Sequence, residues 1–211
     1  MAAPTELPDA IPLFPLGGAL LFPDAQLPLH VFEPRYRRLV KDAMEGRRVI
    51  GMIQPRGDEG RAPPLYPVGC LGAIAGLEAL DDGRFNLILQ GVRRFRLVRE
   101  LDVTTPYRQA QVEYLPEEPD DALGLANRAE LEGEARAFAD ALGYQVDWDA
   151  LGSLDDETLV HLIAQVAPFD VASKQALLEA GSVPDRAELL VQFMSFQRML
   201  PGGAGGPATF Q

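Results

Sequence analysis

Side chains that carry covalent catalysis are scarce in this chain. The serines are Ser153, Ser173, Ser182 and Ser195, and the lysines are Lys41 and Lys174. A serine nucleophile needs a base within hydrogen-bonding reach, and the G-x-S-x-G turn that presents such a serine is absent. Ser153, Ser173 and Ser182 instead stand where helices are expected to begin. The sequence therefore predicts no catalytic residues.

The sequence also lacks the residue patterns that bind metal ions or phosphate groups. Zinc takes about four Cys, His or carboxylate ligands at close spacing, whereas the chain has one cysteine, Cys70, and two histidines, His30 and His161, in different halves. Neither lysine follows the glycine-rich loop of a Walker A motif. The carboxylate pairs 81–82 and 155–156 stand at a turn and at a helix start, not across a substrate. We expect no metal and no cofactor.

The densest run of functional side chain types is "LPLHVFEPRYRRLVKDAM" (27–44). Its first part alternates apolar and polar residues, which is typical of a half-buried strand, and Pro28 belongs at a strand start or an edge. Pro34 suits a first helical position. The residues after it form one apolar helical stripe: Tyr36, Leu39, Val40, Ala43 and Met44. The run thus predicts a strand followed by a helix, with His30 as a satisfied polar residue.

The remainder of the first half is predicted to be rich in β-strands. The expected strands are 47–53, 68–80, 84–98 and 107–115. Residues 55–64 read as a loop, 81–83 as a turn, and Gly91 as a bend. Several short strands with one inserted helix predict a small, curled, barrel-like sheet.

The second half is predicted to be helical. Residues 116–121, "PEEPDD", read as a linker, and helices are expected at 122–142, 157–167, 170–181 and 182–200. Ser153, Asp170 and Ser182 are the expected caps. Leu189, Phe193, Phe196 and Leu200 lie at helical spacing. We expect a β-rich subdomain at 1–117, a helical bundle at 118–200 and a disordered tail at 201–211.

Charge is distributed unevenly between the two halves. Residues 1–115 hold 14 Lys+Arg and 14 Asp+Glu, whereas residues 116–211 hold 5 and 17, which accounts for the whole net charge of −12. Nucleic-acid-binding proteins carry a basic footprint, so we expect no nucleic acid partner. No apolar run approaches a membrane span and no signal peptide is apparent, which predicts a cytoplasmic protein without a membrane partner.

Four sequence blocks together resemble a known family, the N-terminal domain of Lon protease. They are "IPLFPLGGALLFPDAQLPLHVFEPRYRRLVKDAM" (11–44), "VGCLGAI" (68–74), "DGRFNLILQGVRRFRL" (82–97) and "YRQAQVEYL" (107–115). Their order and spacing match the family, and with the helical half the resemblance covers roughly residues 11–200. The family often has glycine after "FP", where this chain has Asp24.

The resemblance implies an α+β fold, with a PUA-like β pseudo-barrel followed by an α-helical bundle. In full-length Lon this module precedes an ATPase and a Ser–Lys protease and helps to capture substrates. The chain has neither a Walker A loop nor a plausible Ser–Lys dyad. The resemblance therefore predicts a stand-alone, proteolysis-associated module that is not an enzyme.

The leading functional hypothesis is a non-catalytic module that binds unfolded or degron-bearing polypeptide. An extended segment could pair with a sheet edge. The candidate contact residues are Phe32, Arg35, Tyr36, Arg93 and Arg94.

Three alternatives remain open at this point. The acidic helical half could make the protein an adaptor for a protease or chaperone. RNA binding would follow only from analogy with PUA folds, which does not carry function. A hydrolase would need a reactive group that the sequence does not reveal. The sequence leaves the oligomeric state undetermined.

Overall fold

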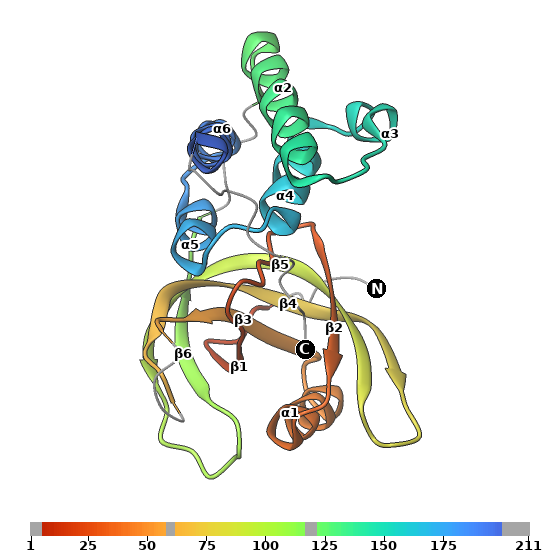
Figure 1. Cartoon of the computed structure of the whole chain (residues 1–211). Coiled ribbons are helices and arrows are strands. Elements are labelled where there is room, and N and C mark those ends of the chain that lie inside the picture. The colour runs from red at the N-terminus through yellow and green to blue at the C-terminus, as the bar shows by residue number, and fades with distance from the viewer. Residues whose placement is uncertain (1–5, 58–61, 117–121, 200–211) are drawn as a thin grey trace. The chain divides into compact units, whose positions relative to one another are not determined.

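A computed structural model describes residues 6–57, 62–116 and 122–199 (Figure 1). The chain divides into two compact units, residues 1–117 and 118–211. Among the described residues, the first unit carries six strands and one helix, and the second carries five helices. This arrangement confirms the predicted α+β class. The predicted tail, and most of the predicted linker, lie outside the described residues.

The β-rich unit begins with a strand and places its helix early. Its elements are β1 (Ala10–Pro15), β2 (Gln26–Val31), α1 (Pro34–Glu45), β3 (Val49–Pro55), β4 (Leu65–Ala79), β5 (Phe85–Glu100) and β6 (Gln109–Tyr114). The predicted strand-into-helix run is therefore confirmed, and Pro34 occupies the first turn of α1 as expected.

The strands close into an irregular ring. Five follow one another in the order β5, β4, β3, β1 and β6, and β6 returns to β5. Strands β1 and β3 run parallel, and the other pairs are antiparallel. Among the described strands, β2 lies outside the ring and pairs only with the first half of β5. The predicted pseudo-barrel is confirmed in outline, but it is not a regular barrel.

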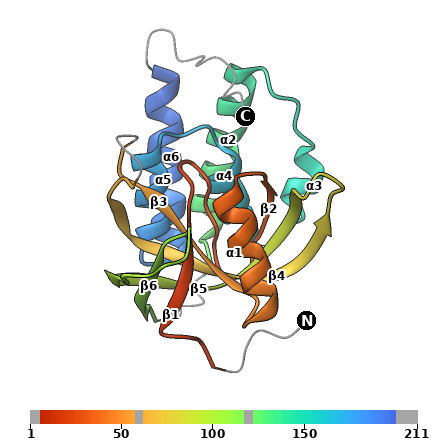
Figure 2. The ribbon, with the colours of Figure 1, turned by 90° about the horizontal axis from the view of Figure 1, so that it is seen from below.

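Strands β4 and β5 are long because the pairing partners of each strand change along its length. β5 pairs with β2 through its first half and with β6 through its second half. β4 pairs with β3 only as far as Ala73. Register shifts at Val92 and Ala75 bend the two strands where their partners change, which confirms the bend predicted near Gly91. The hairpin formed by their other halves extends from the ring (Figure 2).

Two hydrophobic cores support this unit. One draws on all five ring strands and comprises Ile11, Leu13, Val49, Ile53, Leu71, Phe95, Ala110 and Val112. The other includes one face of α1, whose predicted stripe is buried at Tyr36, Leu39, Val40 and Ala43. Burial of that stripe fixes which side chains α1 turns away from the sheet.

A tight turn holds the chain against β5 just before β2. Asp24 has φ 58°, a left-handed conformation that favours glycine but that Asp tolerates better than most residues. It stands where the resembled family often has glycine. The Asp24 N–H donates to the Gly91 carbonyl at 3.2 Å, and the Gly91 N–H donates to the Ala25 carbonyl at 2.8 Å. The turn therefore lies directly on the backbone of β5.

The helical unit contains α2 (Leu125–Leu142), α3 (Trp148–Gly152), α4 (Asp156–Val166), α5 (Val171–Glu179) and α6 (Val183–Met199). Asp170 caps α5 as predicted, and the Ser182 hydroxyl accepts from the Asp185 N–H at the start of α6. The predicted cap Ser153 is wrong, because Asp155 accepts from the Thr158 N–H and begins α4 instead. No described helix has the length and hydrophobicity needed to cross a bilayer.

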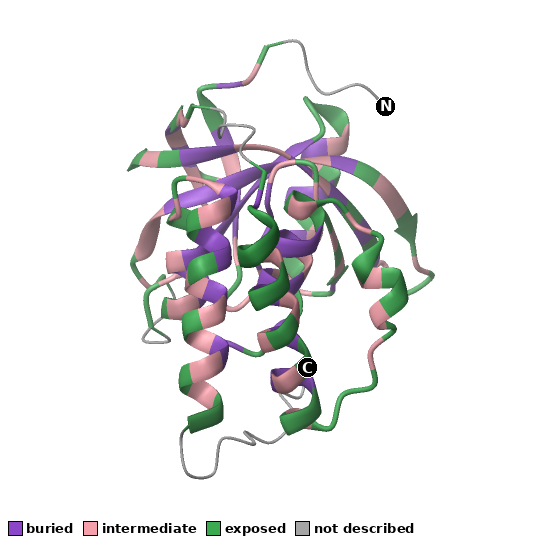
Figure 3. Ribbon diagram, turned by 90° about the horizontal axis from the view of Figure 1, so that it is seen from above, coloured by how far each residue is buried: buried purple, intermediate pink, exposed green. Residues whose placement is uncertain are grey.

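Helix α6 buries a different stripe from the one that its sequence suggests. Its buried residues are Val183, Arg186, Ala187, Leu190 and Met194. Phe193 is only partly covered and Phe196 is 63% exposed. Figure 3 shows purple, buried positions along one side of the longer helices, whereas α3 has none.

Candidate functional site

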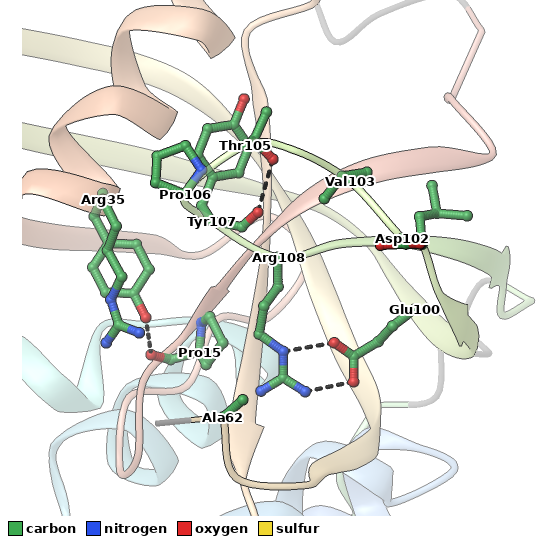
Figure 4. A pocket seen from close by; sticks show the side chains of 12 residues that line it. Pro15, Arg35, Ala62, Glu100, Asp102, Val103, Thr105, Pro106, Tyr107 and Arg108 are labelled. Atoms are coloured by element: carbon green, nitrogen blue, oxygen red, sulfur yellow. Dashed lines mark hydrogen bonds and ion pairs between the residues drawn. The ribbon is translucent and has the colours of Figure 1, made fainter. Parts of the chain in front are cut away.

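A pocket of about 300 Å³ opens beside the N-terminal half of α1 (Figure 4). Its walls come from the end of β1, the start of α1 and the connection between β5 and β6. Twelve residues line it: Pro15, Arg35, Tyr36, Ala62, Glu100, Leu101, Asp102, Val103, Thr105, Pro106, Tyr107 and Arg108. The pocket therefore combines apolar walls with charges of both signs.

Tyr36 lines this pocket and is buried against the core. Its ring stacks on Phe14 with centroids 4.1 Å apart, and the guanidinium of Arg35, labelled in Figure 4, lies 4.5 Å from its centroid. Arg35 also donates from Nε to Glu33 at 2.9 Å. Burial raises the pKa of Tyr36. Tyr36 thus acts as a neutral aromatic wall, and Arg35 is the group that a ligand would meet.

The opposite wall is held by ion pairing. Arg108 binds both carboxylate oxygens of Glu100, with Nε 2.6 Å from Oε2, and donates from Nη1 to the Pro63 carbonyl at 2.8 Å. Thr105 donates to the Tyr107 carbonyl at 2.9 Å. The two carboxylate oxygens of Glu100 are therefore engaged by a bidentate arginine. These bonds hold the wall in place, and its polar side chains can form hydrogen bonds with a ligand.

Tyr107 lines both this pocket and a second hollow of about 510 Å³. The second hollow lies beside the C-terminal half of α1 and is lined by Asp42, Ala43 and Gly46 together with residues 6–10. The Tyr107 hydroxyl donates to Asp42 Oδ2 at 2.8 Å. Burial and this carboxylate raise the pKa of Tyr107 to about 12, while Arg38 lowers the pKa of Asp42. We call the two hollows together the α1 groove.

The two hollows lie along a helix that is about as long as a short extended peptide. Helix α1 has 12 residues, which corresponds to about 18 Å. An extended chain rises about 3.3 Å per residue, so roughly five extended residues would match the length of this helix. Mixed apolar and polar walls of this kind suit side chains of varied chemistry.

The structure brings together only two of the five predicted contact residues. Arg35 and Tyr36 share the pocket, whereas Phe32 does not line it and is 49% exposed at the end of β2. Arg93 and Arg94 lie on β5 opposite Leu71 and Cys70, and neither lines the α1 groove.

Tyr107 and Arg108 line the pocket although sequence reasoning did not single them out. They follow the Thr-Thr-Pro turn before the last strand, and nothing in their spacing indicates that this turn folds back to α1.

The two histidines and Lys174 have side chains whose type could suit acid–base chemistry, and the structure shows where each of them lies. His30 is exposed, with Nδ1 2.8 Å from Asn86 Oδ1, whereas His161 is buried and lies in the other unit. Lys174 donates from Nζ to the Gln165 carbonyl at 2.9 Å, and burial lowers its pKa. No group of three potential metal ligands occurs within the described ranges.

The tyrosines of the β-rich unit give a pH-dependent prediction. The pKa values of Tyr107 and Tyr114 are raised from 10.0 to about 12. The folded state therefore holds these protons more tightly than the unfolded state, so their contribution to stability is complete below pH 10 and is lost as the pH rises toward 12. We expect stability to fall across that interval, and Tyr107→Phe to flatten the decline.

Denaturant unfolding at several alkaline pH values, with tyrosinate absorbance, would measure both effects. An unchanged pH slope in Tyr107→Phe would contradict the assignment. Tyr66→Phe is the control, because Tyr66 packs against Arg56 away from the α1 groove.

Comparisons of the sequence with protein families and with individual proteins both match Lon proteases. A sequence profile described as the ATP-dependent protease La (LON) substrate-binding domain matches residues 10–195. Lon protease 2 of Sorangium cellulosum is 31% identical over 92% of this chain and 25% of that protein. Lon protease 1 of Herpetosiphon aurantiacus is 27% identical over 86% of this chain and 24% of that protein. The chain thus spans about a quarter of the length of these relatives.

Solved structures support the same fold. A Lon N-terminal domain protein from Xanthomonas campestris aligns with a TM-score of 0.65 at 24% identity, covering 88% of this chain and 98% of that one. The N-terminal domain of a Mycobacterium avium complex Lon protease aligns with the same TM-score and coverage at 16% identity. The sequence blocks that suggested the resemblance all fall within the matched residues. The chain therefore belongs to the family of LON substrate-binding domains.

Proposed function

We propose that this protein is a non-catalytic module that binds unfolded or degron-bearing polypeptide. The observation that carries the proposal is the α1 groove, where Arg35, Tyr36 and Tyr107 border two hollows along one helix. Membership of a substrate-binding family supports the same ligand class.

The composition of the α1 groove suits a peptide better than a small metabolite. Pro15, Leu101 and Val103 provide apolar contact, whereas Arg35 and Asp102 can meet charges of either sign. Small-molecule sites usually enclose most of their ligand, but this groove consists of two hollows that share one lining side chain. A flexible chain can place successive side chains in the two hollows.

A non-catalytic role is consistent with the extent of the family match. The matched profile is that of the substrate-binding domain, and the ATPase and protease activities of longer relatives belong to those proteins. His30, Lys174 and Glu100 each form hydrogen bonds within the fold, to Asn86, the Gln165 carbonyl and Arg108 respectively.

Binding of fluorescein-labelled denatured casein, followed by anisotropy, tests this function. We expect saturable binding in the micromolar range and a Kd about fivefold or more higher for Arg35→Ala, because truncating a central contact residue commonly costs over about 1 kcal/mol. Lys41→Ala is the matched control, since Lys41 is an exposed cation of α1 that does not line the α1 groove.

The proposal fails if wild-type protein gives no saturable signal at tens of micromolar. It also loses its site if Arg35→Ala and Lys41→Ala bind casein equally well.

The alternative is an adaptor that docks a protease or chaperone through its acidic helical unit. Its supporting observation is the charge division, with 5 Lys+Arg against 17 Asp+Glu in residues 116–211. Salt screens exposed charges, so adaptor docking should weaken steeply with ionic strength. Casein capture by apolar contacts should persist at high salt, which separates the two functions.

A further inference from the structure

Two stretches beside the β4–β5 hairpin have a free edge within the described part of the chain. One is the outer side of β2, because β2 pairs only with β5. The other is the last part of β4, because β3 pairs with β4 only as far as Ala73. Free edges expose backbone N–H and C=O groups that can pair with another chain. The two edges differ in what they expose.

The hydrogen bonds of the hairpin decide which β4 residues face outward. The Leu80 N–H donates to the Arg84 carbonyl at 2.9 Å, so Leu80 and Arg84 form a hydrogen-bonded pair. Hydrogen-bonded and non-bonded pairs alternate along an antiparallel ladder. Leu77 and Ala79 therefore stand in non-bonded positions relative to β5, and their backbone groups point to the free edge.

The same alternation shows that the outer edge of β2 cannot pair continuously with an added strand. The Gly91 N–H donates to the Ala25 carbonyl, which makes Leu27, Leu29 and Val31 the residues bonded to β5. Pro28 consequently faces outward, at the middle of the edge. Proline has no N–H to donate, and it is a common device for protecting an edge strand. An added strand could not pair continuously along β2.

We propose that the β4 edge from Gly76 to Leu80 accepts an extended polypeptide as an additional strand. This inference rests on the proposed function and names a second contact surface for the same ligand class. Ala79 is exposed and Leu77 is half-buried, so their outward N–H and C=O groups can supply four hydrogen bonds. The ladder would stop at Ala75, where the β-bulge interrupts the register.

Backbone pairing of this kind tolerates many sequences. Main-chain bonds give affinity in strand addition, and only alternate side chains meet pockets. Leu77 lies on the face of the sheet that packs against the α1 core, whereas Glu78 and Ile88 lie on the opposite face. A bound strand would therefore prefer apolar residues on one face only, which many unfolded segments satisfy.

Ala79→Pro is the decisive variant. It removes one outward N–H and places the proline ring at the edge, while the bonds between β4 and β5 stay intact. The probes are a short fluorescent peptide of alternating valine and threonine, and denatured casein. We expect the peptide Kd to rise about tenfold or more for Ala79→Pro and to change less than about twofold for Ala79→Ser, which keeps the N–H.

Amide hydrogen exchange on wild-type protein gives an independent readout. Added peptide should slow exchange at Leu77 and Ala79 and leave Glu78 unchanged, because Glu78 already bonds to β5. Protection at His30 instead would show that β2 is the edge used, and would overturn the assignment. Pro28→Thr should create a second binding edge on β2.

The outcomes separate this inference from the proposed function. If casein binds wild type, and both probes bind Ala79→Pro as tightly as Ala79→Ser, strand addition is wrong while polypeptide binding stands. If neither probe binds wild type, both fail.

Discussion

Replacing Gly91 with alanine is expected to lower the free energy of unfolding of the β-rich unit by roughly 3 kcal/mol or more. A Cβ built on Gly91 would lie 1.8 Å from the Phe22 carbonyl oxygen and 3.2 Å from the Pro23 Cα. Both obstacles are backbone atoms. The turn cannot move aside, because its bonds to Gly91 hold it on β5.

Gly76→Ala is the matched control for this change. A Cβ there would meet only the Ile88 side chain, at 3.4 Å, which is an ordinary contact. We expect a loss below about 1 kcal/mol for Gly76→Ala. Urea unfolding followed by hydrogen exchange of β5 segments would measure both variants. Equal stability of the two would mean that the turn before β2 does not lie against Gly91.

Replacing Arg186 with methionine is expected to destabilise the helical unit by about 3–5 kcal/mol. Arg186 is 0% exposed. Its Nε donates to the Leu177 carbonyl at 2.8 Å, and its Nη2 reaches the Ala180 carbonyl at 3.4 Å, both at the C-terminal end of α5. Its Nη1 lies 2.9 Å from His161 Nε2 on α4. Methionine fills similar space but leaves these acceptors without their donor.

Arg198→Met tests whether the effect comes from burial. Arg198 lies on the same helix and pairs with Glu134 at 2.7 Å, but its side chain is 31% exposed. Exposed ion pairs contribute about 0–1 kcal/mol, so Arg198→Met should cost little. The fluorescence of Trp148, the only tryptophan, reports unfolding of this unit. A loss below about 1 kcal/mol for Arg186→Met would contradict its role in joining α4, α5 and α6.

Both proposed binding surfaces depend on the local rules that build the β-rich unit. The buried stripe of α1 fixes Arg35 on the side of the helix that lines the pocket. The bulge at Ala75 and the loss of β3 pairing beyond Ala73 create the β4 edge. A polypeptide could therefore use side-chain pockets at the α1 groove and backbone bonds at the hairpin.

Periodicity in the sequence was sufficient for much of the local structure. Alternation at residues 27–32 predicted the faces of β2, and the 3.6-residue stripe predicted the buried side of α1. Each pattern records burial of one face against a neighbouring element. The patterns indicated a β-rich half followed by a helical half, and the family resemblance then specified a PUA-like β pseudo-barrel followed by a helical bundle. The roles of the predicted contact residues and the cytoplasmic location stay predictions.

Local pattern was insufficient in the helical half. The apolar residues Leu189, Phe193 and Phe196 lie at helical spacing, yet α6 buries the stripe that contains Arg186 and Leu190. A helix with apolar residues on two sides has two plausible inward faces. Packing against α2, α4 and α5 decides between them, and single-sequence periodicity does not contain that information.

The sequence by itself determined most of the strands and helices, several of the residues that begin them, and the absence of recognisable catalytic motifs, because these depend on side chains near one another along the chain. Strand β1 and helix α3 were not among the predicted elements. Tertiary structure alone decided that the β5–β6 connection meets α1 to form the groove, that Phe32 and the arginines of β5 stand apart from it, and that β4 keeps a free edge while Pro28 closes the other. The reason is physical: pockets and sheet edges arise from pairings between distant segments, and strand register and core packing are settled only when the chain closes on itself.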